Sequence, residues 1–508
     1  MLKDTNFFPK QSLEIYEKLK TADKNGQLDD AVAGIFTEEN ANNINLVTIW
    51  RCREYLCKLS DEIIEARPHL LSYRILIEAM RGNLKKCDLL LQKYGPEFEK
   101  LDLAKLDRVG IYRLMNELVM PQYSNEDFLN RARFLATVAS LTGMSFDSLV
   151  LTACRPSVFN GFRDFSDICI DMEKRKTELQ KGIELLYGSS GKGVYEVAHA
   201  EWCYEHGDSF GALVEVAGTI PVLEHEKDTR CLFAAYVLQI RILVLNGQTK
   251  AALSLFRNIR NRMYETGSEE FEESLLAVMC HYYCYVGELA QVENWLYNEA
   301  PDENDDLCMM DTYSYLIKMR CYIQIGQYMM TIVLGKKMLE LLKPSNRPHD
   351  KCECHMLIAM ACYEAGDEQR AMEELEQALL IASEYKYVRL FADEGQMMLV
   401  LLRVYKMNHK DSPIDDKYIR EIHNIAMDVA KRFPMYLHTE TNNEIALTKT
   451  EKRVLELMSD GLSNEDIGKA LDKKEGTIKC HTANIYKKFG VANRQQAINF
   501  AKDNGIIS

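Results

Sequence analysis

The chain has 508 residues, 47% of them hydrophobic, which is enough for about three domains with buried cores. It contains only 11 Pro and 26 Gly, and this scarcity favours long helices over turn-rich β structure. The formal net charge of −14 argues against a protein that coats nucleic acid non-specifically. We find neither the pattern of a signal peptide nor an apolar run of 18 residues, so we expect a cytoplasmic chain without membrane contact, whose 15 cysteines stay reduced.

The first 110 residues show a helical pattern. A helix, a glycine and a second helix surround Gly82, in the stretch LIEAMRGNLKKCDLLL. The same unit recurs further along the chain, so we interpret residues 1–110 as the early part of a helical solenoid. Between about Glu97 and Gly193 the helical pattern continues without a regular spacing, and no repeat boundary is predicted there.

Five segments in the middle of the chain repeat this unit at a nearly constant spacing. Their glycines, which step by 40, 40, 39 and 40 residues, are Gly207, Gly247, Gly287, Gly326 and Gly366. A polar residue follows each glycine: Asp208, Gln248, Glu288, Gln327 and Asp367. A small or β-branched residue stands five positions after each glycine: Ala212, Ala252, Val292, Thr331 and Ala371. The alternative, an irregular bundle with coincidental glycines, is disfavoured by five matching steps.

Each position of the repeat has an expected physical role. The glycine ends the first helix in a left-handed conformation, the polar residue starts the second helix, and the small residue lets the two helices approach closely. One pair cannot bury its own apolar face, so neighbouring pairs must stack into a superhelix with a concave surface. We therefore assign residues 111–406 to a tetratricopeptide-like α-solenoid that senses a signal or binds a partner.

Residues 407–446 are interpreted as a helix followed by a linker. The helix is expected from about Ile414 to Arg432, after an apolar helix at 396–405. The segment 433–446 contains Pro434 and the pair Asn442 and Asn443, a composition typical of a linker.

The tail, residues 447–508, differs in charge from the rest of the chain. It contains 11 Lys/Arg and 8 Asp/Glu, a net charge of +3, which leaves −17 on the remainder. Because an acidic body repels phosphate, any contact with DNA is expected in the tail.

The tail predicts four short amphipathic helices with a sharp turn before the third, a pattern typical of a helix-turn-helix unit. Gly461 is expected to stop the first helix, and the third is expected from about Glu475 to Phe489. The helix starts are marked by the capping pairs Thr448 with Glu451, Ser463 with Asp466 and Asn493 with Gln496.

The third helix has two distinct faces. The inner face is expected to carry Ile478, Ile485 and Phe489, with His481 or Thr482. The opposite face carries the residues that would meet base edges and phosphates in a major groove: Lys479, Cys480, Ala483, Asn484 and Lys487.

A specific motif runs through nearly the whole tail. It consists of Leu447-Thr448, Glu451, Val454-Leu455, Gly461-Leu462-Ser463-Asn464-Glu465, Ile467, Glu475-Gly476-Thr477-Ile478-Lys479, His481, Asn484-Ile485-Tyr486, Lys488 and Asn493-Arg494. With these residues the tail resembles the LuxR-type helix-turn-helix family. The resemblance implies binding of double-stranded DNA by the third helix, as a homodimer on paired half-sites.

The resemblance also implies roles for individual residues. Base-contacting positions of the family fall on Lys479, Cys480 and Ala483, and backbone-contacting positions fall on three others: Thr477, Asn464 and Lys488.

The chain departs from the family pattern just before the third helix. An apolar residue and a serine usually precede the Glu-Gly-Thr run, whereas this chain has Lys473 and Lys474. The usual N-cap is therefore missing, at a cost of about 1 kcal/mol. Asp472 is an alternative cap that would start the helix earlier.

Two further motifs, outside the repeats, lie in the body. They are Arg155-Pro156-Ser157-x-Phe159-Asn160-Gly161-Phe162-Arg163-Asp164-Phe165 and Leu390-Phe391-x-Asp393-Glu394-Gly395. With these motifs and its repeats, the body resembles the helical sensor region of large LuxR-type regulators of the MalT kind. Those regulators also have an N-terminal nucleotide-switch domain, which we expect to be absent here, because the chain opens with helices and lacks a GxxxxGK[ST] sequence.

Other constellations are weaker. The string GSSGKG at 188–193 has the wrong spacing for a phosphate-binding loop, so we interpret it as an inter-helix loop and predict no cofactor. The groups Cys280, His281, Cys284 and Cys352, Cys354, His355 are interpreted as buried core rather than metal ligands, since they lack a CxxC pair. The Tyr- and Met-rich stretch 307–330 favours a core stripe over a ligand groove.

Cys480 is interpreted as a small residue against a base edge. Because Lys479 and His481 flank it, a redox-sensing thiol is the alternative.

The sequence thus predicts an all-α protein, a tetratricopeptide-like α-solenoid followed by a four-helix LuxR-type domain at 447–508. The expected function is sequence-specific transcription regulation, with an unknown small-molecule or protein effector on the solenoid and RNA polymerase as a further candidate partner. No catalytic constellation or metal site is predicted. The alternatives are a solenoid scaffold whose tail makes protein contacts, and a regulator that depends on a separate nucleotide-switch partner.

Overall fold

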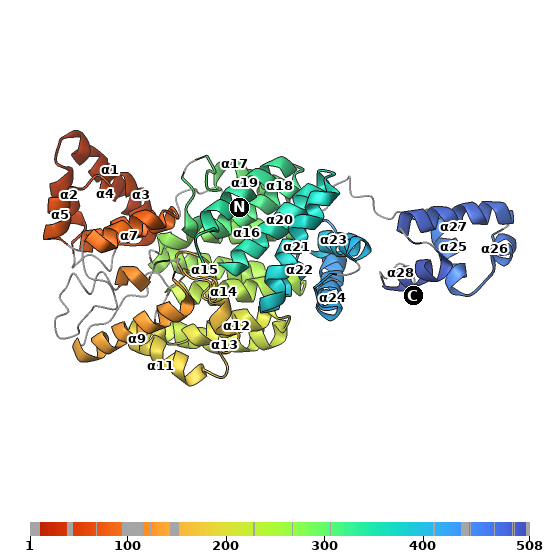
Figure 1. Ribbon diagram of the computed structural model, residues 1–508, viewed down its shortest axis with the longest axis horizontal. Helices are drawn as coiled ribbons and strands as arrows, with labels where there is room; N and C mark the ends of the chain where they lie inside the picture. The colour runs from red at the N-terminus through yellow and green to blue at the C-terminus, as the bar shows by residue number, and fades with distance from the viewer. Residues whose placement is uncertain are drawn as a thin grey trace. The chain divides into compact units, whose positions relative to one another are not determined.

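The computed structural model describes residues 11–37, 44–67, 69–93, 115–118, 120, 123–142, 152–226, 229–266, 268–304, 306–409, 412–437, 447, 449–471, 473–489, 491 and 493–503. All regular elements in these ranges are helices, which confirms the all-α fold (Figure 1). The chain divides into two compact units, Met1–His438 and Thr439–Ser508, called here the body and the tail unit. Among the described helices, none has the length and apolar character needed to cross a bilayer.

Seven short helices open the body. They are α1 (Gln11–Lys24), α2 (Leu28–Ile35), α3 (Leu46–Arg51), α4 (Arg53–Leu56), α5 (Asp61–Ala66), α6 (His69–Met80) and α7 (Leu84–Lys93). They pack around a core that includes Leu19, Phe36 and Ile49. Gly26 and Gly82 both adopt a φ of +72°, so α1–α2 and α6–α7 are joined by the same left-handed glycine turn. The sequence pattern revealed this turn only at Gly82.

An irregular region separates these helices from the repeats. Its helices are α9 (Asn125–Thr142), α10 (Ser166–Cys169), α11 (Lys176–Tyr187) and the 3₁₀ helix η4 (Gly188–Gly191). The loop prediction for 188–193 is confirmed, since η4 leads through Gly193, at φ +82°, into the first repeat. Lys192 Nζ lies 2.7 Å from Glu226 Oε1, so its charge is engaged in a surface ion pair.

Five helix pairs follow, one for each predicted repeat (Figure 1). They are α12 (Val194–Glu205) with α13 (Ser209–Glu226), α14 (Thr229–Leu245) with α15 (Thr249–Thr266), α16 (Glu272–Val286) with α17 (Leu289–Asn298), α18 (Thr312–Gln324) with α19 (Tyr328–Leu342), and α20 (Pro348–Glu364) with α21 (Glu368–Tyr385). Two 3₁₀ turns, η5 (Glu269–Phe271) and η6 (Met309–Asp311), precede α16 and α18.

The glycines of the repeats adopt the expected left-handed conformation. Their φ angles lie between +74° and +90°. The small residues five positions later, from Ala212 to Ala371, are at most 1% exposed, as expected for positions where two helices approach closely. The turn after Gly366 is completed by Asp367, whose carboxylate accepts a hydrogen bond from the Arg370 backbone N–H.

The repeat stack returns to its own beginning. After α21 come α22 (Arg389–Ala392), α23 (Gly395–Asn408) and α24 (Asp416–Arg432). The short helix α22 contacts α12 of the first pair, where the Val388 backbone N–H donates to the Glu205 carbonyl at 2.9 Å. The first helices of the pairs therefore surround a common interior.

The segment after α24 corrects the linker interpretation. Residues 433–437, called here the strap, pack into the body, and Tyr436 and Leu437 are each 1% exposed. The Tyr436 ring stacks on Tyr285 with centroids 4.0 Å apart, and the Leu437 backbone N–H donates to Gln324 Oε1 at 2.6 Å. Pro434 suggested a linker, but the apolar side chains beside it are long enough to reach the core. Residues 438–446 lie outside the described part.

The tail unit contains the four predicted helices, α25 (Lys449–Ser459), α26 (Asn464–Ala470), α27 (Glu475–Phe489) and α28 (Arg494–Asp503). Gly461, at φ +84°, ends α25. Ser463 Oγ accepts from the Asp466 N–H at 3.2 Å, and Asn493 Oδ1 accepts from the Gln496 N–H at 2.9 Å, so both predicted caps are confirmed. The first predicted cap, Thr448, lies outside the described residues.

Candidate DNA-reading face and inner cavity

The sharp turn between α26 and α27 depends on a glycine. The Lys473 N–H donates to the Gly468 carbonyl at 2.9 Å, which brings the turn against the end of α26. A Cβ at Gly468 would lie 2.7 Å from the Lys473 carbonyl oxygen, closer than atoms approach without a bond. A side chain here would force the two helices apart, so Gly468 sets the angle at which α27 is presented.

The helix α27 begins at Glu475, as predicted. The Lys474 carbonyl accepts from the backbone N–H groups of Thr477 and Ile478, at 2.8 and 3.2 Å. Both Lys473 and Lys474 are exposed, and neither side chain offers an acceptor for the free N–H groups of the first turn. The alternative cap, Asp472, lies outside the described residues. The start of α27 therefore presents two exposed cations, Lys473 and Lys474.

The inner face of α27 is as expected. Ile478, Ile485 and Phe489 are at most 2% exposed and belong to the core of the tail unit. Thr482, rather than the half-buried His481, completes this face, since its hydroxyl donates to the Ile478 carbonyl at 3.1 Å.

The opposite face of α27 is open to solvent. Its exposed residues, called here the recognition face, are Thr477, Lys479, Cys480, Ala483 and Asn484. Lys487 and Lys488 belong to the same helix, but their side chains lie outside the described part. Asn464, at the start of α26, is half-buried. The structure thus brings five of the eight predicted contact residues together on one accessible surface.

An ion pair within the helix occupies Lys479 in the free protein. Its Nζ lies 2.9 Å from Glu475 Oε1, one turn earlier. Both side chains are about half exposed or more, and such pairs contribute little stability. The pair therefore costs little to exchange for a phosphate or a base edge.

Arg494 has a structural role. Its Nη2 donates to the carbonyls of Met458, at 3.0 Å, and Leu462, at the end of α25. The Met458 carbonyl also accepts from the Gly461 N–H at 3.1 Å, so Arg494 adds a second donor there and fixes the position of α28 against the end of α25.

A second candidate site lies inside the body. The first helices of all five pairs, with Leu390 and the loop 155–160, line a cavity of about 110 Å³. Its polar lining includes Glu201, Arg241, His281, Tyr313, Arg320 and His349. This is the inner surface on which the repeats predicted a signal to bind, and it has room for several water molecules or a small polar ligand.

One wall of the cavity is built on Asp350. Its carboxylate accepts from Arg155 Nη1 and Nη2 at 2.9 and 2.7 Å, from Arg347 Nε at 2.5 Å and from Asn160 Nδ2 at 2.7 Å. Burial opposes ionisation, but the two guanidinium groups outweigh it and hold the pKa of Asp350 well below its usual range. The conspicuous loop motif is thereby fixed to α20.

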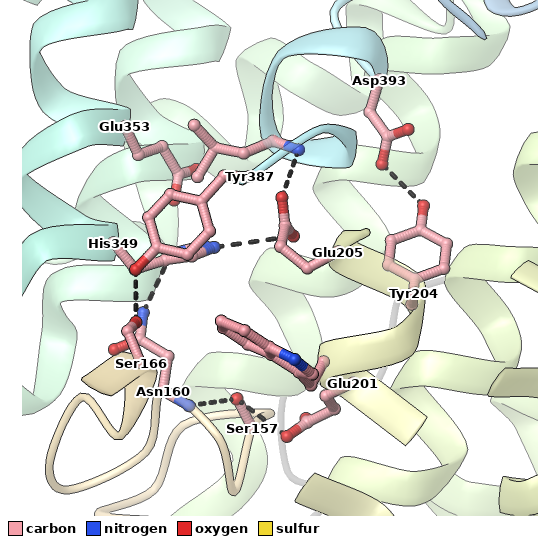
Figure 2. A network of polar contacts seen from close by, with 12 residues as sticks. Ser157, Asn160, Ser166, Glu201, Tyr204, Glu205, His349, Glu353, Tyr387 and Asp393 are labelled. Carbon is pink, nitrogen blue, oxygen red and sulfur yellow. Dashed lines mark hydrogen bonds and ion pairs between the residues drawn. The ribbon is translucent and has the colours of Figure 1, made fainter. Parts of the chain in front are cut away.

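Glu201 also lines the cavity and lies beside Ser157 (Figure 2). Its Oε2 accepts from the backbone N–H groups of Val158 and Phe159, at 3.0 and 2.7 Å, and from Ser157 Oγ at 3.2 Å. Burial raises the pKa of Glu201 to about 7 in spite of these bonds. Its charge therefore changes near neutral pH.

Glu205, one turn after Glu201, joins three segments (Figure 2). Its carboxylate lies 3.6 Å from His349 Nε2 and accepts from the Leu390 N–H at 2.6 Å. Burial opposes the charge of His349, but Glu205 outweighs this and raises the pKa of the imidazole. Glu205 therefore favours the charged form of His349 beside the cavity.

The motif LFADEG supplies two further buried acids, Asp393 and Glu394. Asp393 accepts from the Tyr204 hydroxyl at 2.6 Å (Figure 2) and from Arg241 Nη2 at 2.8 Å. Arg241 lines the cavity, and 36% of its side chain is accessible.

Glu394 connects the cavity to the strap. It accepts from Arg320 Nη2 at 2.5 Å and from the Tyr436 hydroxyl at 2.9 Å. Arg320 itself lines the cavity. A change in the cavity can therefore reach the strap through a single carboxylate.

Comparison with known families covers both candidate sites. Residues 184–408 match the model described as MalT-like TPR region, and residues 445–501 match the model described as bacterial regulatory proteins, luxR family. The chain carries a MalT-like TPR region followed by a LuxR-family domain. The TPR region contains the five helix pairs, and the LuxR-family domain contains the recognition face. The LuxR-family match supports a DNA-binding regulator, and neither matching model is a catalytic family.

The sequence did not predict the polar lining of the TPR interior. One signal was present, since Glu201 and Glu205 stand one turn apart on a helix whose other inward residues are apolar. The partners of Glu205, His349 and Leu390, come from segments 144 and 185 residues away, and no local pattern connects them.

Proposed function

We propose that this chain is a sequence-specific transcription regulator that binds promoter DNA through α27 and senses a signal inside its TPR region. The LuxR-family match together with the exposed recognition face carries the first half of this proposal. A helix with one apolar and one exposed face fits the major groove, where the exposed side chains can reach base edges.

The proposed division of labour follows side-chain chemistry. Lys479, Cys480 and Ala483 would face the bases, where an ammonium donates to guanine and small side chains permit close approach. The remaining contact residues, which would hold phosphates and set the register, are Thr477, Asn464, Asn484, Lys487 and Lys488. Binding as a homodimer on paired half-sites, and contact with RNA polymerase, belong to the same proposal.

The proposed domains are a helical region at 1–110, the solenoid at 111–406, a connecting helix and linker at 407–446, and the DNA-binding domain at 447–508. The buried strap shortens the linker to the residues after Leu437.

The cavity and the strap support the sensing half of the proposal. The cavity holds acids and bases that are paired with one another, so it suits a small polar effector better than an ion of either sign. An effector that moved Arg320 or Glu394 would weaken or strengthen the hydrogen bond between Glu394 and Tyr436. The strap would then be released from the body or held more firmly, and with it the linker that leads to the LuxR-family domain. A protein effector on the outer surface is the other form of signal.

Selection of random DNA duplexes on the full chain tests the proposal. We expect an enriched motif with two related half-sites, bound with a steep dependence on salt. Failure to enrich any motif, with and without a mixture of cellular small molecules, would instead favour the scaffold, whose tail contacts protein.

A further inference from the structure

Three cysteine thiols converge inside the TPR region. Cys280 and Cys284 lie one turn apart on α16, and Cys321 lies on α18 of the next pair. The Sγ of Cys321 is 3.4 Å from that of Cys280 and 3.9 Å from that of Cys284, and all three lie within 4.8 Å of one another. The side chains are at most 1% exposed.

The sequence grouped Cys280 and Cys284 with His281 and could not identify the third thiol. His281 faces away from them, since its Nε2 lies 3.1 Å from the Tyr436 hydroxyl. Cys321 takes the third place because the stacking of α16 on α18 brings the two helices into contact.

Packing alone does not require thiols at these positions. Counted from the glycine of each repeat, the three sites fall seven, three and five residues before it. The other repeats have residues other than cysteine at the same positions. Seven residues before the glycine they have Ala200, Ile240, Met319 and Ala359, and three residues before it they have Tyr204, Val244, Ile323 and Tyr363. Five residues before it they have Trp202, Ile242, Tyr282 and Ala361. The fold therefore accepts many side chains there, and thiols coincide only where α16 meets α18.

The spacing of the sulfurs suits a single soft ion. Bonds of about 2.3 Å between an ion and thiolate sulfur place three sulfurs in a plane about 4 Å apart, and closer if the ion lies above their plane. Zinc sites in proteins are usually tetrahedral and need a fourth ligand. No fourth histidine, cysteine or carboxylate belongs to this group in the described part of the chain, which favours an ion that is satisfied by three thiolates.

Burial decides the charge of the ion. Three thiolates around monovalent copper would leave two negative charges in the core, and a divalent ion would leave one, whereas a trivalent ion gives a neutral complex. Uncompensated charge in a protein interior is strongly unfavourable.

We propose that Cys280, Cys284 and Cys321 form a three-thiolate site for a trivalent thiophilic ion of the arsenic group. Neutral arsenous acid, As(OH)₃, reacts with three neutral thiols to give As(SR)₃ and three water molecules. Three S–H and three As–O bonds break, three As–S and three O–H bonds form, and no oxidation state changes. The step thus leaves no net charge in the core.

The site is placed to influence the strap. The helix α16 also carries His281 and Tyr285, which hold Tyr436 by a hydrogen bond and by ring stacking. Bonds that tie α16 to α18 would shift these two side chains together. The binding chemistry itself is independent of the proposed DNA binding.

The experiment uses the full chain, reduced with a phosphine and freed of small thiols. Sodium arsenite is added, unbound arsenic is removed by gel filtration, and arsenic and free thiols are counted. We expect about one arsenic retained per chain and the loss of three titratable thiols. The unfolding midpoint should rise, since a ligand that binds only the folded state stabilises it.

Single variants Cys280→Ala, Cys284→Ala and Cys321→Ala are each expected to lose stoichiometric retention. Cys362→Ala removes a buried thiol outside the group and should retain arsenic like the unaltered chain. Circular dichroism of each variant without arsenite separates loss of the site from loss of the fold. If Cys321→Ala folds and still retains arsenic, or if the unaltered chain retains zinc or copper(I) but no arsenic, the assignment is wrong.

Discussion

Arg155 and Asp350 form a buried, two-pronged ion pair between residues 195 positions apart in the sequence. The two side chains are 4% and 0% exposed. Such a pair fixes the direction of both groups, because the planar guanidinium matches the two carboxylate oxygens. The loop that precedes α10 is thereby held against α20, and this contact shapes one wall of the inner cavity.

Removing the charge of Asp350 should therefore be costly. Asp350→Asn leaves the buried guanidinium groups of Arg155 and Arg347 without their counter-charge, and we expect a loss of roughly 3–5 kcal/mol in the free energy of unfolding. Urea unfolding followed by circular dichroism measures it. Asp428→Asn removes an exposed partner of Lys431, at 4.0 Å, and should change stability by less than about 0.5 kcal/mol. Equal effects of the two changes would contradict the structural role of Asp350.

Glu201 should make the stability of the body depend on pH. Its pKa is raised from 4.5 to about 7 in the folded state, so the folded protein binds more protons than the unfolded chain between these values. Stability is then greatest below pH 4.5, as far as this group is concerned, and falls as the pH rises through 7, by on the order of 3 kcal/mol.

Glu201→Gln keeps an acceptor for Val158 and Phe159 but cannot ionise. We expect the variant to gain stability over the unaltered protein as the pH is raised from 5 to 8, in unfolding experiments at each pH. Glu288→Gln, at an exposed position, should follow the unaltered protein throughout. A gap between Glu201→Gln and the unaltered chain that does not change with pH would contradict the buried carboxyl assignment.

The hydroxyl of Tyr436 should hold the strap in place. Tyr436→Phe keeps the ring stacked on Tyr285 but leaves Glu394 and His281 without this partner, at a cost of about 1–3 kcal/mol. We expect faster hydrogen exchange at the Leu437 amide, which bonds to Gln324. Unchanged exchange at this amide would mean that stacking alone fixes the strap.

Two lysines of α27 should differ in their effect on DNA binding. Lys479→Ala is expected to weaken binding to the selected duplex by about 1–3 kcal/mol and to relax its sequence preference. Lys488→Ala should weaken binding to all duplexes and reduce the slope of log K against log salt by about 1. Lys452→Ala removes an exposed charge from α25 and serves as the matched control. Binding titrations at several salt concentrations distinguish the three variants.

Cys480 offers a direct test of the recognition face. It is the one exposed cysteine among all fifteen, so a small alkylating agent should modify it first. Bound operator DNA should protect it, whereas a duplex without the motif should protect it less at the same concentration. Mass spectrometry of the peptide that contains Cys480 measures the rate, and equal rates with and without operator would place this face away from the DNA.

The sequence correctly predicted the features that depend only on residues close together in the chain. The glycine turns of the repeats, the two described caps of the tail unit and the exposed face of α27 all follow from residues within one or two turns of each other. The tail was the most predictable part, because nearly every position of its motif has a defined place in a small core.

Contacts between residues far apart in the sequence could not be predicted from it. The last part of the body contacts its first repeat because α22 packs against α12. Nothing in the sequence of either helix predicts this contact. The strap was misassigned for a related reason, since the burial of Tyr436 depends on Tyr285 and Glu394 from distant helices. The third thiol of the cysteine group was missed because Cys321 follows Cys284 by 37 residues, nearly one repeat.

The buried strap has a practical consequence for exchanging modules. A chimera joined at the end of α24 would remove Tyr436 and Leu437 from the interior of the donor and leave Gln324 and Tyr285 facing a gap. The natural junction for grafting another output domain onto this sensor therefore falls after Leu437, beyond the last helix of the body. The strap, residues 433–437, therefore belongs structurally to the sensor, although it follows the last helix of the body in the sequence.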